Sequence, residues 1–187
     1  QLPSFLSPFS NDLMFELKFL KTYLNNYLKE NLNLNQRRDY WIYDGIQIFL
    51  MMQYADEYFP DLKMTGNVAN LKILKSYHFV NLDFNQQYNY LYMLMARKNL
   101  DQALNEPKNR LVKFNEQIAS KYRAGLSLKY LDSYLGNDIV HNTIKEYIQE
   151  NQYFGTNSRQ FETVLLKNSP KDINWFFRTV IETRDLI

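Results

Sequence analysis

The sequence has no cysteine, which excludes disulfide bonds, thiolate metal sites and cysteine nucleophiles. Glycine and proline are also scarce, with five of each in 187 residues. Because these two residue types mark turns and breaks, their scarcity predicts long helices. So few glycines also argue against a glycine-rich loop of the kind that surrounds a phosphate group.

Long apolar runs and a strong net charge are missing as well. The longest apolar run, residues 46–52, is interrupted by Gln47 and is too short to cross a membrane, so we expect no membrane insertion by this segment. Lysine and arginine total 22 against 20 acidic residues, with no basic stripe or tail in the sequence. This balance gives no electrostatic footprint for nucleic acid, and we expect no nucleic-acid partner.

The chain begins Gln1-Leu2-Pro3, without an initiator methionine. We therefore expect it to be a piece of a longer protein, with the rest of that polypeptide as a partner. Any targeting signal, including one for an extracytoplasmic location, would then lie before Gln1. The absence of cysteine does not fix the compartment, because disulfide-free proteins occur on both sides of membranes.

Aromatic residues are abundant, with 15 Tyr, 13 Phe and 2 Trp. Such side chains bury a large area each, so the chain can form the core of one domain over residues 1–187. Apolar residues recur at helical spacing, and no segment alternates like a strand. The expected helices cover residues 11–31, 40–58, 68–74, 85–104, a segment that starts at 107, 125–135, 139–154, 158–167 and 173–181, with an otherwise irregular connection at 61–83.

Several residues predict where these helices begin and end. Ser10 precedes the first helix, Gly136 suits the C-terminal cap of the helix at 125–135, and Asp138 can cap the next. Residues 169–172, SPKD, resemble a capping box with Pro170 inside the first turn of the last helix. The sequence therefore predicts an all-α, multi-helix bundle.

Aromatic stripes accompany the leucine faces of several helices. We interpret these stripes as core, because helical spacing of large apolar side chains is typical of a buried face. They include Tyr88, Tyr92, Phe176 and Phe177, and in the first helix Phe15, Phe19, Tyr23 and Tyr27 form a stripe beside the leucines.

One carboxylate lies in an unusual place. Asp44 is one turn into a helix that is apolar nearly all round, and Ile48, Met51, Met52 and Ala55 follow on its face. A carboxylate that points to the core needs a partner or a proton. One interpretation is a helix-start aspartate bonded to free backbone N–H groups or to a nearby Arg or Tyr. The other is a functional, or formerly functional, ligand position.

Candidate metal ligands are otherwise few. The two histidines, His78 and His141, lie 63 positions apart and belong to no pair at i and i+4. A tetrahedral site would need Asp or Glu side chains to converge on them. Ordinary surface or partly buried histidines are therefore the favoured interpretation, and no serine lies in a nucleophile-elbow sequence.

Three segments resemble a known family. Residues 39–46, DYWIYDGI, are similar to the D-x-W-[LI]-x-E-G-[FI] segment of aminopeptidase-N-like gluzincins, a family of zinc metallopeptidases. Residues 121–125, KYRAG, resemble its Y-x-K-G helix, and residues 168–177, NSPKDINWFF, resemble its S-G-K-D-L-S-W-F-F tail. The resemblance implies the helical half of a thermolysin/gluzincin-type catalytic domain. It also places Asp44 at the position of the third zinc ligand, and Tyr122 at that of the tyrosine that stabilises the tetrahedral intermediate.

The sequence departs from the family where the metal would bind. In the family, eighteen residues separate HExxH from the glutamate ligand, and that register places HExxH on residues 21–25, KTYLN. Lys21 and Asn25 then occupy the two histidine positions, and Thr22 replaces the catalytic glutamate. The separation of Asp44 from Tyr122 is also long for the family. The resemblance thus implies a dismantled zinc site with no zinc or other cofactor, in which Lys21 pairs with Asp44 in place of the metal.

Three functions stay open at this point. The first is a non-catalytic, peptidase-derived helical domain of a larger protein, serving as a scaffold or binding a peptide. The second is part of an active zinc aminopeptidase whose remaining ligands lie upstream. The third is a helical protein-interaction domain unrelated to the peptidases.

Overall fold

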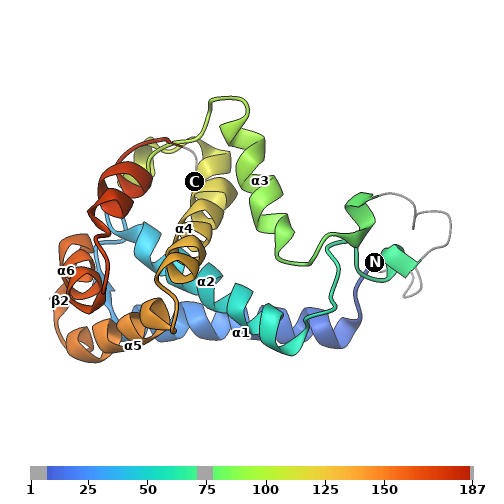
Figure 1. Cartoon of the computed structure of the whole chain (residues 1–187), viewed down its shortest axis with the longest axis horizontal. Helices are drawn as coiled ribbons and strands as arrows, with labels where there is room; N and C mark the ends of the chain where they lie inside the picture. The colour runs from blue at the N-terminus through green and yellow to red at the C-terminus, as the bar shows by residue number, and fades with distance from the viewer. Residues whose placement is uncertain (1–7, 71–77, 186–187) are drawn as a thin grey trace.

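The computed structural model describes residues 8–70 and 78–185. Within these residues the fold is all-α, as the sequence predicted (Figure 1). The α-helices are α1 (Asn11–Asn31), α2 (Tyr40–Tyr58), α3 (Gln86–Ala96), α4 (Ser120–Leu135), α5 (Ile139–Asn151) and α6 (Ser158–Asn168). Extended structure in a sheet is limited there to two two-residue parallel strands, β1 (Asn33–Leu34) and β2 (Gly155–Thr156). None of the described helices is both long and apolar enough to cross a membrane.

The first two helices form an antiparallel pair. Ser10 caps α1 as predicted, because its hydroxyl accepts a hydrogen bond from the backbone N–H of Leu13 at 3.2 Å. The buried face of α1 consists of leucines that recur every three or four residues, namely Leu13, Leu17, Leu24 and Leu28. The side-chain amide of Gln47 in α2 donates to the backbone carbonyl of Lys21 at 2.7 Å. This bond fixes the register of the two helices.

Two glycines allow α2 and α4 to approach each other closely. A Cβ atom at Gly45 would lie 3.2 Å from the Cβ of Ala124, and one at Gly125 would lie 2.3 Å from Cγ2 of Ile48. Gly125 lies within α4 and not at the start of a helix, so the predicted boundary there is wrong. Its role is to admit the side chain of Ile48 against the α4 backbone.

The predicted helix boundaries on either side of α4 also need correction. The segment that follows Pro107 begins with a short 3₁₀ helix, Lys108–Arg110, and then runs through a π-helical turn, Asn115–Ala119, directly into α4. The two helices expected there are therefore largely one. The helix predicted at 85–104 ends at Ala96, because Asn99 takes a left-handed conformation with φ of 55°.

The other predicted helix ends agree with the structure in part, and the capping interaction expected at an end is not always present. Gly136, with φ of 71°, terminates α4 as expected. Asp138 precedes α5 but makes no side-chain capping bond. Ser169 is the C-terminal cap of α6, so it does not open a capping box, and Pro170 lies outside the last helical segment, which ends in the π-helical turn Phe176–Ile181. The predicted helix at 68–74 appears as a 3₁₀ helix, Gly66–Asn70, and residues 71–74 lie outside the described residues.

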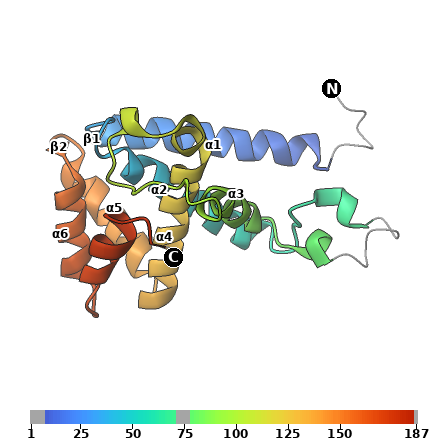
Figure 2. The same cartoon turned by 90° about the horizontal axis from the view of Figure 1, so that it is seen from above.

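The main core lies where α2, α4, α5, α6 and the C-terminal segment meet. It includes Trp41, Phe49, Tyr147, Phe161 and Phe176, all nearly inaccessible to solvent. The predicted burial of Tyr88, Tyr92, Phe176 and Phe177 is confirmed. In Figures 1 and 2, α1 runs along one edge of the molecule, and the α5–α6 end lies opposite the end at which α1 begins.

Candidate functional site

Asp44 lies between α2 and α4, where it forms an ion pair with Lys121. Its Oδ1 is 3.4 Å from the Lys121 ammonium, and only 15% of the aspartate side chain is exposed. Burial raises the pKa of the Asp44 carboxyl, while the charges of Lys121, Lys108 and Lys29 lower it in part. The carboxylate predicted to point inward is therefore largely but not fully buried, and it is influenced by cations from three segments of the chain.

The predicted ion pair between Lys21 and Asp44 is wrong. Lys21 is exposed and forms no ion pair with any residue that the structure describes, and Asp44 binds Lys121 in its place. Thr22 is also exposed, and its hydroxyl donates to the backbone carbonyl of Lys18 at 2.9 Å. Only Asn25, at the second histidine position of the family, is half-buried.

The helix register nevertheless brings the aligned ligand positions to one level. Gln47 of α2 binds the carbonyl of Lys21 in α1. Because the two helices are antiparallel, the residue one turn after Lys21 in α1 lies level with the residue one turn before Gln47 in α2. Asn25 is thus level with Asp44. The charge of Lys29, one further turn along α1, acts on the same carboxylate. Residues 21, 25 and 44 therefore belong to facing turns of two adjacent helices.

Tyr122 lies beside Lys121 in sequence but contacts a different surface. Its ring packs edge-on against Tyr88 of α3, with centroids 4.8 Å apart and an interplanar angle of 89°. It also packs against the small cluster formed by Ile48 and Met52, and burial raises the pKa of its hydroxyl. The structure thus places Lys121 on Asp44, and Tyr122 in an apolar contact between α2, α3 and α4.

The histidines do not come together with these residues. His141 is exposed, with Nδ1 3.1 Å from the side-chain oxygen of Gln53. The side chain of His78 lies outside the part of the structure that is described. Over residues 8–70 and 78–185, no group of three or more His, Cys, Asp or Glu side chains is placed to hold a metal ion.

Arg123 is a buried arginine whose role the sequence did not predict. Arg123 is only 1% exposed and lies 3.4 Å from Asp101, which is itself buried. Its guanidinium also donates to backbone carbonyls near the C-terminus, those of Val180, Thr183 and Asp185. It therefore fastens the segment after α3 and the C-terminal segment to α4. The available signal was its place on the buried face of α4, one turn before Ser127.

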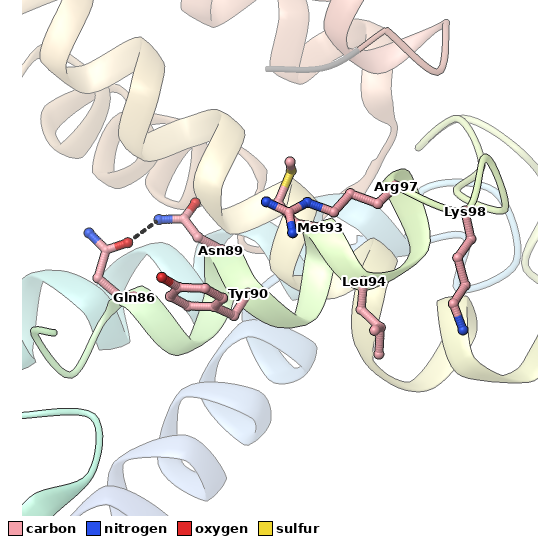
Figure 3. Close-up of a pocket in the computed structure, with 7 residues that line it drawn as sticks. All are labelled: Gln86, Asn89, Tyr90, Met93, Leu94, Arg97 and Lys98. Carbon is pink, nitrogen blue, oxygen red and sulfur yellow. Dashed lines mark hydrogen bonds between the residues drawn. The ribbon is translucent and has the colours of Figure 1, made fainter. Parts of the chain in front are cut away.

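The outer face of α3 carries a hollow of about 480 Å³ (Figure 3). Its lining consists of side chains that follow the length of α3 and the two residues beyond it, namely Gln86, Asn89, Tyr90, Met93, Leu94, Arg97 and Lys98. The amide of Asn89 donates to Gln86 at 3.1 Å. Neither Asp44 nor Tyr122 lines this hollow, and neither lines any of four further hollows on the described part of the chain.

A local basic cluster is a further feature that the sequence did not reveal. Arg37 and Arg38 follow β1, and Lys108 and Arg110 lie in the segment before α4. Arg37 donates to the side chain of Asn109 at 2.9 Å and lines two adjoining hollows, one with Lys108 and one with Arg38 and Arg110. The fold thus brings together two pairs of cations that are distant from each other in the sequence.

The aromatic stripe of α1 is not core, contrary to prediction. Phe15, Phe19, Tyr23 and Tyr27 are 73%, 64%, 54% and 39% exposed. The leucine face next to the stripe satisfies the packing of α1 on α2, so the rings turn to solvent. Large exposed apolar patches are typical of interaction surfaces.

Comparisons with known proteins add no relative. No family model, no curated protein and no solved structure matches the chain.

Proposed function

We propose that this chain is a non-catalytic, peptidase-derived helical domain of a larger protein, and that it serves as a scaffold and binds a peptide. The observation that carries the proposal is the ion pair between Asp44 and Lys121. In the family that the sequence resembles, the acid at this position binds zinc. Here a lysine ammonium neutralises it, and the pair joins α2 to α4.

The neighbouring positions support the same function. Hydrolysis at such a site needs a metal-activated water and a general base. Thr22, at the position of the base, has no carboxylate and its hydroxyl binds the α1 backbone. Tyr122 packs against Tyr88. On this proposal Asp44 and Tyr122 are structural relics, and the domain requires no zinc or other cofactor.

The α3 hollow is the peptide-binding surface of this proposal. Tyr90 and Leu94 supply exposed apolar contact, and Arg97 and Lys98 lie at its C-terminal end. Neither cation forms an ion pair with another described residue, so both are available to an anion. These side chains suit a short peptide that carries an apolar side chain followed by a carboxylate. Nucleic acid is not a partner in this proposal.

The test is metal content and peptidase activity of the full-length protein that contains this chain. The proposal predicts less than stoichiometric zinc and no turnover of aminopeptidase substrates above a buffer control. Stoichiometric zinc together with turnover would contradict it and would favour an active aminopeptidase whose other ligands come from outside this chain.

A further inference from the structure

The exposed face of α1 carries an aromatic ridge, defined as Phe15, Phe19, Tyr23 and Tyr27. The rings follow one another at intervals of four residues, and neighbouring rings are stacked. The centroids of Phe19 and Tyr23 are 6.4 Å apart, and those of Tyr23 and Tyr27 are 6.0 Å apart. The exposure of the four rings shows that the ridge faces solvent, and α1 itself lies along an edge of the molecule in both views (Figures 1 and 2).

A groove runs beside the aromatic ridge. It is a hollow of about 440 Å³, and its far side is formed by Thr22, Asn26 and Glu30. Lys18 continues this row by one turn of α1, and the four residues Lys18, Thr22, Asn26 and Glu30 define the polar row. The middle of the row is neutral, and its ends carry opposite charges. Neither Lys18 nor Glu30 forms an ion pair with any described residue. A ridge and a groove that both follow i±4 spacing are the two halves of the commonest helix-packing arrangement.

We propose that this face binds a second copy of the chain, with α1 packed against α1 of the partner subunit about a two-fold axis. An axis perpendicular to α1 runs the two helices antiparallel and makes every contact occur twice. It places Lys18 beside Glu30 of the partner subunit, and Glu30 beside Lys18 of the partner subunit. A parallel arrangement would instead bring like charges together at both ends of the polar row.

The aromatic ridge fits the same axis. Leu24 lies halfway between Lys18 and Glu30 in sequence, and Tyr23 lies halfway between Phe19 and Tyr27. One axis near these two positions therefore pairs the charges and also places Phe19 beside Tyr27 of the partner subunit. The neutral centre of the polar row leaves room for the ridge of the partner, because Thr22 and Asn26 are small and uncharged.

The exposed area limits the strength of such a dimer. The four rings expose on the order of 450 Å², if a full aromatic side chain offers about 200 Å². Stable interfaces bury roughly 800 Å² on each partner, so the ridge supplies about half of that area and the polar row has to contribute the rest. The expected dimer is reversible and forms as the protein concentration rises.

The test is sedimentation equilibrium of the 187-residue chain over a range of concentrations. The wild-type chain should change from monomer to dimer, and Tyr23→Ser should abolish this change. The matched control is Tyr90→Ser, because Tyr90 on α3 is 53% exposed against 54% for Tyr23. All these positions are exposed, so the variants should keep the helical circular dichroism of the wild type.

Charge reversal tests the antiparallel pairing. Lys18→Glu or Glu30→Lys alone should each raise the dimer dissociation constant about tenfold, because each creates two like-charge contacts. The double variant exchanges the charges and should return to the wild-type value. A chain that stays monomeric at every concentration overturns the proposal, even if it binds lipid vesicles or a different protein. A dimer that Tyr23→Ser leaves intact, or that the double variant does not restore, also overturns it.

Discussion

The Asp44 carboxylate lies 3.4 Å from the Lys121 ammonium, in the part of the fold where α2 and α4 pack most closely. Two of the family-like segments, residues 39–46 and 121–125, meet there. Gly45 of the first faces Ala124 of the second, and Gly125 of the second faces Ile48 just beyond the first. Residues that the sequence resemblance selected separately thus form one helix contact, and the central acid of that contact has a lysine partner.

Replacing Lys121 by methionine should destabilise the fold. The substitution keeps the length of the side chain but leaves the Asp44 carboxylate largely buried without its cation. We expect a loss of about 1–2 kcal/mol in the free energy of unfolding, below the value for a fully buried pair because both side chains retain some exposure. Urea unfolding at neutral pH measures it.

The control for this variant also carries Asp44→Asn, which removes the orphaned charge. That double variant should regain most of the lost stability. If Lys121→Met alone unfolds at the same urea concentration as the wild type, the pair has no structural role.

The stability that Asp44 confers should depend on pH in a defined direction. Burial raises its pKa above the ordinary 3.8, so the folded state holds the Asp44 proton more tightly than the unfolded state does. The contribution is therefore complete below the ordinary pKa and is lost as the pH rises through the folded-state pKa. Relative to Asp44→Asn, the wild-type free energy of unfolding should fall as the pH rises from about 4 to 7.

Asp172 provides an internal comparison of opposite sign. Hydrogen bonds from the backbone and side chain of Asn174 lower the pKa of its carboxyl. Relative to Asp172→Asn, the wild type should therefore lose stability as the pH falls below the ordinary pKa of 3.8, and should change little from pH 4 to 7. Equal slopes for the two aspartates would show that the environment of Asp44 is misassigned.

Gly125→Ala should destabilise the chain although alanine is the better helix former. The new Cβ would lie 2.3 Å from Cγ2 of Ile48 and 3.3 Å from the backbone N of Phe49. We expect a net loss of about 1–3 kcal/mol, since overpacking outweighs the gain in helix propensity. Thermal unfolding measures it, with Gly155→Ala as control because no atom lies within 4 Å of a Cβ there. Equal melting temperatures for the two variants would contradict the close approach.

The sequence was informative where the signal is local. The Ser10 cap, the extent of α2 and the stop at Gly136 depend on neighbouring residues, and each was predicted correctly. The helix start predicted at Gly125 is wrong, because local preferences for glycine do not reveal a neighbour as distant in sequence as Ile48. The burial of Asp44 could be inferred from the spacing of the residues around it.

The partners of buried charges could not be inferred in the same way. Lys121 lies far from Asp44 in sequence, and the resemblance pointed to Lys21 because the sequence does not show the rotation of α1. Arg123 binds carbonyls that only the folded C-terminal segment brings near it. The stripe Phe15 to Tyr27 and the leucine face of α1 both repeat at helical spacing, so periodicity alone does not decide which of them faces solvent.

The α3 hollow should bind a short peptide that ends in an apolar residue and a free carboxylate. Fluorescence anisotropy with a labelled Phe-terminated peptide measures the affinity, and the same peptide with an amidated C-terminus serves as the control ligand. Arg97→Glu/Lys98→Glu should weaken binding of the free acid at least tenfold by placing like charge against it, with little effect on the amide. Equal affinity for both peptides would show that the two cations do not recognise the carboxylate.

Zinc titration of a rebuilt site tests directly whether Asp44 occupies a former metal-ligand position at the level of residues 21 and 25. Lys21→His/Asn25→His places two histidines at i and i+4 in the turns of α1 level with Asp44, with position 25 half-buried, and Thr22→His/Asn26→His gives the same spacing at two exposed positions as a control. Isothermal titration should show that adding Asp44→Asn weakens zinc binding to the first variant about tenfold and leaves the control unchanged. If Asp44→Asn has no effect on either variant, residue 44 does not share a site with positions 21 and 25, and the account is wrong.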